Sequence, residues 1–444
     1  MRAKIEKLVY GGEGLAHEGG EAVFVPFVLP GEEVELTPGT RKKKFVRARV
    51  TRVLEASPDR VAARCPHFGR CGGCDYQHVS YEAQLRYKEE ILRETLRRLG
   101  RIDWQGPVTL HASPPWEYRN RAQWKIRPHS IEGGRPREDA GSVARSSGSE
   151  HSDIGYFRAG SSTLCPVQVC TILSPKLLAT FEQFRAMLSE EKLPETLREV
   201  EAFADAEDQG ILLNLSCTSL PRGADALAKM LSERIDGVKS ILLQDVRGER
   251  MSLHGPGFLQ YKVMQSSFRV GHLSFFQVNR FLVNEMANVA AAAAGGGELA
   301  FDLYAGVGLF ATTLAGNFGR VEAVEANPAA ARDLETNAGL SGKTIKARND
   351  SAESFLAEWK QKREATPDVV IVDPPRAGIE PTALDKLAAI APARILYVSC
   401  DPSTLARDLA NLCTRAYALQ EIHLFDMFPQ TYHIETLVRL ERVR

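Results

Sequence analysis

The sequence contains no long hydrophobic run, no signal-peptide pattern and no excess of charge of either sign. No uncharged apolar stretch reaches the roughly 18 residues that a membrane-spanning helix needs, and residues 1–7 lack the apolar core of a signal peptide. The 56 Lys and Arg residues equal the 56 Asp and Glu residues, which argues against a surface coated with positive charge but allows local basic patches. We therefore expect a cytoplasmic protein with no membrane partner.

Cysteine is too sparse for a disulfide scaffold. The 444 residues include 8 unevenly spaced cysteines, whereas disulfide scaffolds are short chains dense in cysteine. Hydrophobic residues make up 44% of the chain and charged residues 25%, which is typical of a globular protein. A chain of this length should fold into about two or three domains, at least one with a large core.

The first 56 residues predict a small β-barrel. Short apolar segments at 22–28, 33–36 and 45–50 are separated by Gly and Pro turns, and small barrels of this kind often bind nucleic acid. The basic run 41–44 fits a solvated hairpin as well as an RNA contact. A second basic group alternates around Trp124 and consists of Arg119, Arg121, Lys125 and Arg127.

The region between the barrel and the C-terminal half is mixed. Apolar side chains recur at helical spacing over residues 81–99, which predicts a helix there. Residues 108–270 predict an α+β domain. Within them, residues 131–153 are rich in Gly, Ser and charge without an apolar period, so we interpret this stretch as a mobile surface insertion.

From about residue 271, strands, glycine loops and helices alternate. This order predicts an α/β fold with a doubly wound, Rossmann-like parallel sheet. The predicted strands are 298–304, 321–325, 369–373 and 394–399, and the predicted helices are 281–294, 328–338, 351–358 and 404–412.

The loop at residues 302–308 has the features of a nucleotide site. It follows a predicted strand, opens a helix, and contains Gly306 and Gly308, which let a backbone approach a ligand closely. Glu325 ends the next strand, where a carboxylate can hold ribose hydroxyls. The third glycine of a dinucleotide loop is missing, and so is the Lys-Ser/Thr pair of a phosphate-binding loop. These features favour S-adenosylmethionine over NAD.

Three cysteines lie within residues 65–74: Cys65, Cys71 and Cys74. Thiols at this spacing can converge on a metal or cluster, and the two glycines between the last two permit a tight turn. Cys165 is the best candidate for a fourth ligand, with Cys170 in reserve. Four thiolates are compatible with an iron–sulfur cluster and with structural zinc.

Cys400 directly follows the apolar run 394–399. A lone intracellular cysteine is most often a small core residue. However, Asp302 and Asp373 also lie near the ends of apolar runs, and polar residues at the tips of parallel strands line a ligand crevice. The sequence therefore predicts a functional thiol.

Together these segments resemble one family, the S-adenosylmethionine-dependent RNA uracil-5-methyltransferases, which make 5-methyluridine in bacterial 23S ribosomal RNA or in tRNA. The resemblance extends over nearly the whole chain. The matching segments occur in the family's order: 275–279, 302–308, 373–378, 399–402 and 433–436.

The resemblance implies a role for each part of the chain. Residues 1–56 would form a TRAM barrel that binds RNA. Residues 57–80 and 108–270 would form a central iron–sulfur domain, and residues 81–107 and 271–444 the methyltransferase domain. The implied [4Fe-4S] ligands are Cys65, Cys71, Cys74 and Cys165.

The resemblance also implies the site residues. Cys400 would be the nucleophile and Glu435 the proton acceptor. The implied cofactor contacts are Gln277, Tyr304, Glu325, Asp350 and Asp373, beside Gly306 and Gly308. The chain departs from the family pattern at Leu309, at Asp401 and in the insertion.

The chemistry needs these residue types. Uracil C5 is too weak a nucleophile to attack a sulfonium methyl group, but addition of a thiolate at C6 makes C5 electron-rich. A carboxylate can then accept the C5 proton, and the base must leave its stack to reach the thiol. We expect 23S ribosomal RNA as the target of a monomeric enzyme, with tRNA as the alternative.

Three other functions remain open. Cys400 with His433 could serve a hydrolase, but that function leaves the glycine loop unexplained. A methyltransferase acting on exocyclic amines would want an aromatic residue at position 376, where this chain has Arg. A non-catalytic iron–sulfur RNA-binding protein would explain the barrel and the cysteines but not Cys400 together with Glu435.

Overall fold

The computed structural model describes residues 1–127 and 153–443, which fall into two compact units. The first unit comprises Met1–Gly69, Cys74–Arg119 and Gln260–Arg444, and the second comprises Arg70–Gly73 and Asn120–Leu259. Most of the predicted insertion, residues 131–152, lies outside the described residues. No helix in the described part of the chain is long and apolar enough to cross a membrane.

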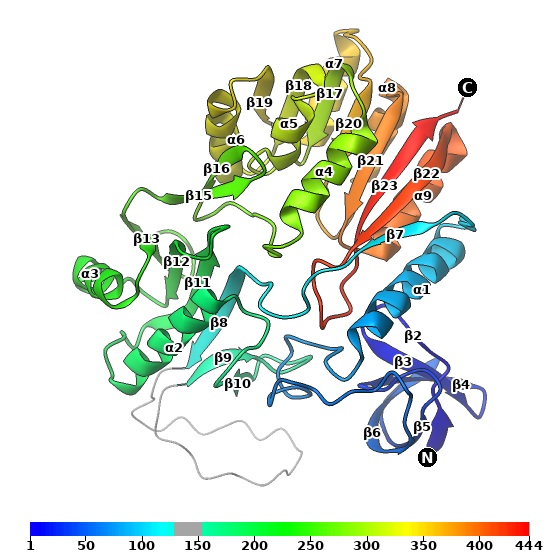
Figure 1. Ribbon diagram of the computed structural model, residues 1–444, viewed down its shortest axis with the longest axis vertical. Helices are drawn as coiled ribbons and strands as arrows, with labels where there is room; N and C mark the ends of the chain where they lie inside the picture. The colour runs from blue at the N-terminus through cyan, green and yellow to red at the C-terminus, as the bar shows by residue number, and fades with distance from the viewer. Residues whose placement is uncertain (128–152, 444) are drawn as a thin grey trace. The chain divides into compact units, whose positions relative to one another are not determined.

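The N-terminal part of the first unit is a curved six-stranded sheet around a small apolar core (Figure 1). Its inward side chains are small and mostly β-branched, which suits a tightly curved sheet. The strand order is β1-β5-β6-β4-β3-β2. The strands are β1 (Arg2–Lys4), β2 (Lys7–Leu8), β3 (Glu13–Glu18), β4 (Glu21–Pro26), β5 (Glu33–Lys42) and β6 (Phe45–Glu55).

The rest of the first unit is built on an eight-stranded sheet of order β19-β18-β17-β20-β21-β23-β22-β7. The five strands β19, β18, β17, β20 and β21 run parallel to one another, whereas β23 is antiparallel to both of its neighbours. The strands are β7 (Val108–His111), β17 (Gly297–Leu303), β18 (Phe318–Glu325), β19 (Ile345–Asn349), β20 (Val369–Val372), β21 (Arg394–Ser399), β22 (Tyr417–Phe425) and β23 (Glu435–Arg442).

Helices cover both faces of this sheet (Figure 1). One face shares a single apolar core with α1 (Tyr81–Leu99), α7 (Ala352–Gln361), α8 (Pro381–Ile390) and α9 (Pro402–Arg415). The other face is covered by α4 (Val283–Ala294), α5 (Leu309–Leu314) and α6 (Pro328–Leu340). A separate hairpin of β15 (Phe258–Val263) and β16 (Ser266–Gly271) precedes α4. The predicted doubly wound fold is confirmed.

The second unit is a seven-stranded mixed sheet of order β10-β9-β8-β11-β12-β13-β14 with two helices. Phe181 and Phe184 of one helix and Leu231 of the other share a buried core with the sheet. The elements are β8 (Arg121–Arg127), β9 (Asp153–Phe157), β10 (Leu164–Pro166), α2 (Pro175–Ser189), β11 (Leu197–Ala204), β12 (Ile211–Cys217), α3 (Ala224–Arg234), β13 (Val238–Asp245) and β14 (Met251–His254).

The units divide the chain differently from the predicted domains. The sequence interpretation placed residues 108–119 in the central domain, yet Val108–His111 forms β7 and pairs in parallel with β22 of the eight-stranded sheet. Residues 57–69 and 74–80, also predicted there, belong to the first unit. A four-residue edge strand is too short to show its sheet partner by its own pattern, because pairing is decided by tertiary contacts.

Candidate active site

Polar residues stand at the carboxyl ends of all five parallel strands of the eight-stranded sheet. Because neighbouring parallel strands end at the same edge, their tips line one crevice, and β17 lies where the strand order reverses. The predicted nucleophile and four of the predicted cofactor contacts meet there. They are Asp350 after β19, Glu325 ending β18, Tyr304 after β17, Asp373 after β20 and Cys400 after β21.

The loop after β17 is built so that its backbone can approach a ligand. Gly306 has a φ of 55°, and a Cβ on it would meet no atom within 4 Å, so open space lies beside it. Gly308 has a φ of 93°, and a Cβ there would lie 2.7 Å from Leu334 Cδ1. Tyr304 adopts a φ of 63° without being glycine, a backbone conformation that costs about 1 kcal/mol. Strain of this kind persists where surrounding contacts over-determine it, commonly at ligand sites.

Three carboxylates, those of Asp302, Glu325 and Asp373, surround this loop. Glu325 accepts hydrogen bonds from the Gly306 N–H at 2.8 Å and the Asn327 N–H at 2.7 Å. Asp302 is fully buried and accepts from the Ala311 N–H at 2.7 Å, while its Oδ1 has no hydrogen-bond partner in the described part of the chain.

The three carboxylates repel one another. Burial, and then the negative charges of Asp373 and Glu325, raises the pKa of Asp302 well above its ordinary value. Burial and the Glu325 charge raise the pKa of Asp373 to about 7. A bound cation would relieve this repulsion, because an opposite charge favours the ionised carboxylates. This set of carboxylates therefore fits a positively charged ligand, such as a sulfonium compound, that also carries ribose hydroxyls able to donate hydrogen bonds.

Two of these predicted cofactor contacts, Tyr304 and Asp350, already make hydrogen bonds within the protein. The Tyr304 hydroxyl donates to Glu380 Oε2 at 2.6 Å. Asp350 accepts from the Ser351 N–H at 2.8 Å, and its own N–H donates to the Glu325 carbonyl at 3.2 Å. Gln277 is buried in the segment between β16 and α4, outside the row of strand tips.

Cys400 and Glu435 are brought together by strand pairing. Ser399 at the end of β21 lies opposite Thr436 near the start of β23. The next positions along these antiparallel strands are Cys400 and Glu435, so the thiol and the carboxyl face the same end of the sheet. The Thr436 hydroxyl donates to the Ser399 carbonyl at 3.3 Å and supports this register.

The surroundings favour the protonated forms of both groups. Burial, and then the charges of Glu435 and Asp373, raises the pKa of the Cys400 thiol to about 11. Burial and the Asp373 charge raise the pKa of Glu435, which is 5% exposed, well above its ordinary value. Arg376 is the cation that lowers the pKa of both groups. Positive charge entering the site favours the ionised forms, in which the thiolate can act as a nucleophile and the carboxylate as a proton acceptor.

The helix after Cys400 fixes the thiol's backbone. Asp401 is the N-cap of α9, and its carboxylate accepts from the Ser403 and Thr404 N–H groups at 2.8 and 3.1 Å. Pro402 occupies the first turn, where its missing N–H costs nothing. Asp and Asn cap helices about equally well, so the departure at Asp401 keeps the local structure intact.

Sequence reasoning missed Tyr10, which the barrel contributes to this site. Its hydroxyl donates to the Cys400 carbonyl at 3.4 Å, and its ring packs edge-on against Tyr432 with centroids 5.5 Å apart. Nothing in the local sequence marks Tyr10, because Cys400 lies 390 residues away along the chain and Tyr432 lies still further.

The geometry gives no support for a Cys–His hydrolase. Burial, and then the charges of Arg376 and Lys88, lowers the pKa of His433 to about 4. A neutral imidazole does not stabilise a thiolate, and the Cys400 pKa is raised rather than lowered. The Nδ1 atom of His433 also has no hydrogen-bond partner among the described residues.

The predicted cluster cysteines are shared between the two units. Cys65 and Cys74 belong to the first unit, and Cys71 and Cys165 to the second. Within the second unit, the backbone of Cys71 forms an isolated antiparallel β-bridge with Arg158. Cys165 of β10 is the strand partner of Tyr156, which lies two residues before Arg158 in the chain. Across residues 1–127 and 153–443, no group of three or more His, Cys, Asp or Glu side chains is placed to hold a metal ion. The cluster therefore stays a prediction.

The two predicted basic patches differ in structure. The run 41–44 forms the exposed β5–β6 hairpin. The group around Trp124 is not an RNA-stacking surface, because Trp124 is fully buried in the core of the second unit. Its cations on β8 pair with carboxylates: Arg121 with Glu201, Lys125 with Glu199 and Arg127 with Asp153.

Comparisons with known proteins place this site in a family. Residues 224–443 match the family model of tRNA (Uracil-5-)-methyltransferase, and residues 1–58 match the TRAM domain of tRNA (uracil(54)-C(5))-methyltransferase. An RNA methyltransferase of Aquifex aeolicus is 32% identical over 456 residues, covering 99% of this chain and 98% of the relative. One of Halalkalibacterium halodurans is 33% identical over 467 residues, covering 99% and 96%.

The chain belongs to the RNA uracil-5-methyltransferase family. Its fold also resembles the crystal structure of Pyrococcus abyssi tRNA (uracil-54, C5)-methyltransferase in complex with S-adenosyl-L-homocysteine, with a TM-score of 0.73 and 24% identity over 99% of this chain and 100% of that one. Membership in this family makes the protein an RNA methyltransferase with a TRAM domain, and S-adenosylmethionine its methyl donor.

Proposed function

We propose that this methyltransferase modifies C5 of a uridine through a covalent bond between Cys400 and uracil C6, and that Glu435 removes the C5 proton. The observation that carries the proposal is the strand register, which sets a thiol and a buried carboxyl side by side at the ligand edge of the sheet. In the family's chemistry one group must add to the ring and another must accept a carbon-bound proton.

The chain's own residues perform the steps in a defined order. Cys400 and Glu435 first give up their protons to solvent, and the Cys400 thiolate adds to C6, so that C5 becomes the nucleophile. S-adenosylmethionine supplies the electrophilic methyl group. Glu435 then takes the proton from C5, the C6–sulfur bond breaks, and the thiolate leaves. Arg376 favours the anionic forms of both Cys400 and Glu435, because it lowers the pKa of each.

The acidic loop is the proposed cofactor site. Glu325 would hold the ribose hydroxyls, and Gly306 and Gly308 would allow the backbone to come close. Asp302 and Asp373 would face the positive charges of the ligand. The remaining proposed contacts are Gln277, Tyr304 and Asp350.

Two substitutions test the mechanism. Cys400→Ala should abolish methylation and the covalent complex with 5-fluorouridine RNA. Glu435→Gln should still form the complex and transfer the methyl group, but release product at least about 100-fold more slowly. Thermal melting of both variants serves as the folding control. Methylation by Cys400→Ala would refute the covalent route.

We propose 23S ribosomal RNA as the target, on the basis of the four-cysteine set joined to a TRAM barrel. The second candidate is tRNA, which is favoured by the match of residues 1–58 to a tRNA enzyme's TRAM domain. Mapping 5-methyluridine in both RNAs from a deletion strain decides between them. Loss from 23S ribosomal RNA supports the first target, and loss from tRNA alone overturns it.

We also propose that Cys65, Cys71, Cys74 and Cys165 hold a [4Fe-4S] cluster with a structural role. Soft thiolates suit iron and sulfide, and a Cβ on Gly72 would lie 3.0 Å from the Phe157 carbonyl oxygen, so glycine is needed beside Cys71. The Cys170 sulfur instead accepts a hydrogen bond from the Tyr156 hydroxyl at 3.8 Å. Anaerobically purified protein should contain about four irons; stoichiometric zinc without iron would refute the cluster.

A further inference from the structure

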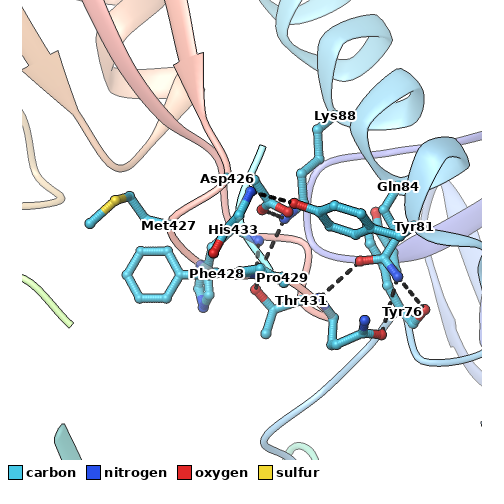
Figure 2. A network of polar contacts seen from close by, with 12 residues as sticks. Tyr76, Tyr81, Gln84, Lys88, Asp426, Met427, Phe428, Pro429, Thr431 and His433 are labelled. Atoms are coloured by element: carbon cyan, nitrogen blue, oxygen red, sulfur yellow. Dashed lines mark hydrogen bonds and ion pairs between the residues drawn. The ribbon is translucent and has the colours of Figure 1, made fainter. Parts of the chain in front are cut away.

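A buried polar network joins helix α1 to the loop that precedes Glu435. This loop, residues 426–434, connects β22 to β23. Tyr81, Gln84 and Lys88 of α1 recur at three- and four-residue spacing, so they share one face of the helix. Figure 2 shows these side chains directed at the loop.

The first contact of this network is a fully buried ion pair. Lys88 Nζ lies 2.6 Å from Asp426 Oδ1, and both side chains are 0% exposed. Lys88 also donates to the Phe428 carbonyl oxygen at 3.0 Å. One ammonium group therefore ties two points of the loop to α1, in a setting where a lone charge would be strongly disfavoured.

The second contact is a reciprocal amide pair. The Gln84 Nε2 group donates to Gln430 Oε1 at 3.1 Å, and the Gln430 N–H donates to Gln84 Oε1 at 2.9 Å. The Gln430 carbonyl accepts from the N–H groups of Asp75 and Tyr76, both at 2.9 Å. Gln430 needs this support, because its φ of 69° is one that side chains other than glycine rarely adopt.

The loop so held leads straight to the proposed proton acceptor. Phe425, the last residue of β22, pairs with Glu435, the first residue of β23. Residues 426–434 are the whole connection between these two positions, so the contacts that hold the loop also support the start of β23. Asn279 adds a side support, since its Nδ2 donates to the Met427 carbonyl at 3.2 Å.

We propose that Lys88 and Gln84 are positioning residues for the proton-removal step: they hold the 426–434 loop so that Glu435 stands beside Cys400. The proposal rests on the proposed roles of Cys400 and Glu435. The proposal gives the polar face of α1 a positioning role. The hydrophobic packing of the helix uses other residues, such as Leu92 and Leu96. Addition of Cys400 to C6 and methyl transfer do not require Glu435, so a loosened loop should slow only proton removal and the release of the thiol.

The test separates methyl transfer from proton removal. Total RNA from a deletion strain grown with [5-³H]uridine is incubated with enzyme and [methyl-¹⁴C]S-adenosylmethionine. The parent enzyme should release one tritium per methyl group. Gln84→Leu and Lys88→Met should show methyl incorporation ahead of tritium release, an accumulating covalent RNA–protein band, and kcat reduced by about 10- to 100-fold. The KM for RNA should change by no more than about twofold, because the substitutions are expected to slow proton removal and not to weaken the binding of RNA.

Gln430→Gly guards against simple loss of folding. Glycine adopts a positive φ without strain, so this variant removes the bond from Gln84 Nε2 to Gln430 Oε1 and keeps the bond from the backbone N–H of residue 430 to Gln84 Oε1. The matched control is Arg86→Met, which lies on the same helix and pairs with Asp59 rather than with the loop; it should behave as the parent.

The outcomes distinguish the two levels of the proposal. Parental coupling of tritium release to methylation in folded Gln84→Leu and Gln430→Gly would overturn the positioning role. Failure of Glu435→Gln to accumulate a methylated covalent complex would overturn the proposed role of Glu435 itself, whatever the Gln84, Lys88 and Gln430 variants do.

Discussion

The Tyr10 hydroxyl donates a hydrogen bond to the carbonyl oxygen of Cys400, 3.4 Å away, and so links the N-terminal barrel to the proposed nucleophile. Burial, and then the charge of Asp401, raises the pKa of Tyr10, so the hydroxyl keeps its proton and remains a donor. The barrel therefore contacts the backbone of the proposed nucleophile, in addition to its predicted binding of RNA.

Tyr10→Phe should lower kcat modestly. One hydrogen bond of this kind contributes about 1 kcal/mol, which corresponds to a factor of about five in rate. Steady-state kinetics on RNA gives the value, and Tyr432→Phe reports on the packing partner without removing the bond to Cys400. An unchanged kcat in Tyr10→Phe would show that the barrel does not position the thiol.

Arg376→Met should make Cys400 less reactive. Arg376 lowers the pKa of the thiol, whereas Glu435 raises it. At about pH 9, the rate of alkylation by iodoacetamide should therefore fall in Arg376→Met and rise in Glu435→Gln, because the thiolate fraction changes in opposite directions. Peptide mass spectrometry measures the rate at Cys400, and the half-buried Cys413 of α9 provides the internal reference. Equal rates in the three proteins would contradict this electrostatic scheme.

Asp373→Asn should flatten the pH dependence of stability in the ligand-free protein. The pKa of Asp373 is raised to about 7 by burial and by Glu325, whereas an unfolded Asp titrates near about 3.9. The folded state therefore holds more protons between about pH 4 and pH 7, and stability falls as pH rises through that window. Thermal melting across this range should show a smaller decline for Asp373→Asn, and S-adenosylmethionine should stabilise the parent most at the upper end.

Arg60→Gln should destabilise the barrel. Glu32 is 0% exposed and pairs with Arg60 Nη2 at 2.7 Å and with the Leu29 N–H at 2.8 Å. Burial opposes ionisation, but the Arg60 and Leu29 hydrogen bonds prevail and lower the pKa of Glu32. Removing Arg60 leaves a buried carboxylate without its cation, at a cost on the order of 3 kcal/mol.

Urea unfolding at about pH 7 measures that loss. Because the folded pKa of Glu32 is lowered, the parent should lose stability as pH falls toward the folded pKa, and the Arg60→Gln variant should lose less. Arg2→Gln, which removes an exposed ion pair with Glu35, is the control and should change stability little.

Four strands of the eight-stranded sheet, β17, β18, β20 and β21, could be predicted from the sequence because apolar residues dominate the predicted segments. The predicted strand 394–399 coincides with β21, and the predicted helix 81–99 coincides with α1. Strands β7, β19, β22 and β23 and helix α8 were not predicted, since their patterns mix polar and apolar residues. β22, for example, carries His423 beside the buried Leu424.

The candidate site was predictable only where a motif signals it. Cys400, Asp373 and Glu325 stand at strand tips, which a pattern of apolar runs reveals. The contacts that hold residues 426–434 were invisible, because Lys88 and Asp426 are separated by 338 residues. A buried lysine within a charged helix looks like any solvated one until its partner is known.

The position of β23 has a consequence for biosynthesis. This strand is made after both of its neighbours, yet it lies between β21 and β22 in the sheet. A nascent chain that has completed Cys400 still lacks both Glu435 and the partner that covers the edge of β21. Such a chain carries a thiol without a proton acceptor, so methylation competence should arrive in one late step, when β23 inserts after translation has passed residue 442.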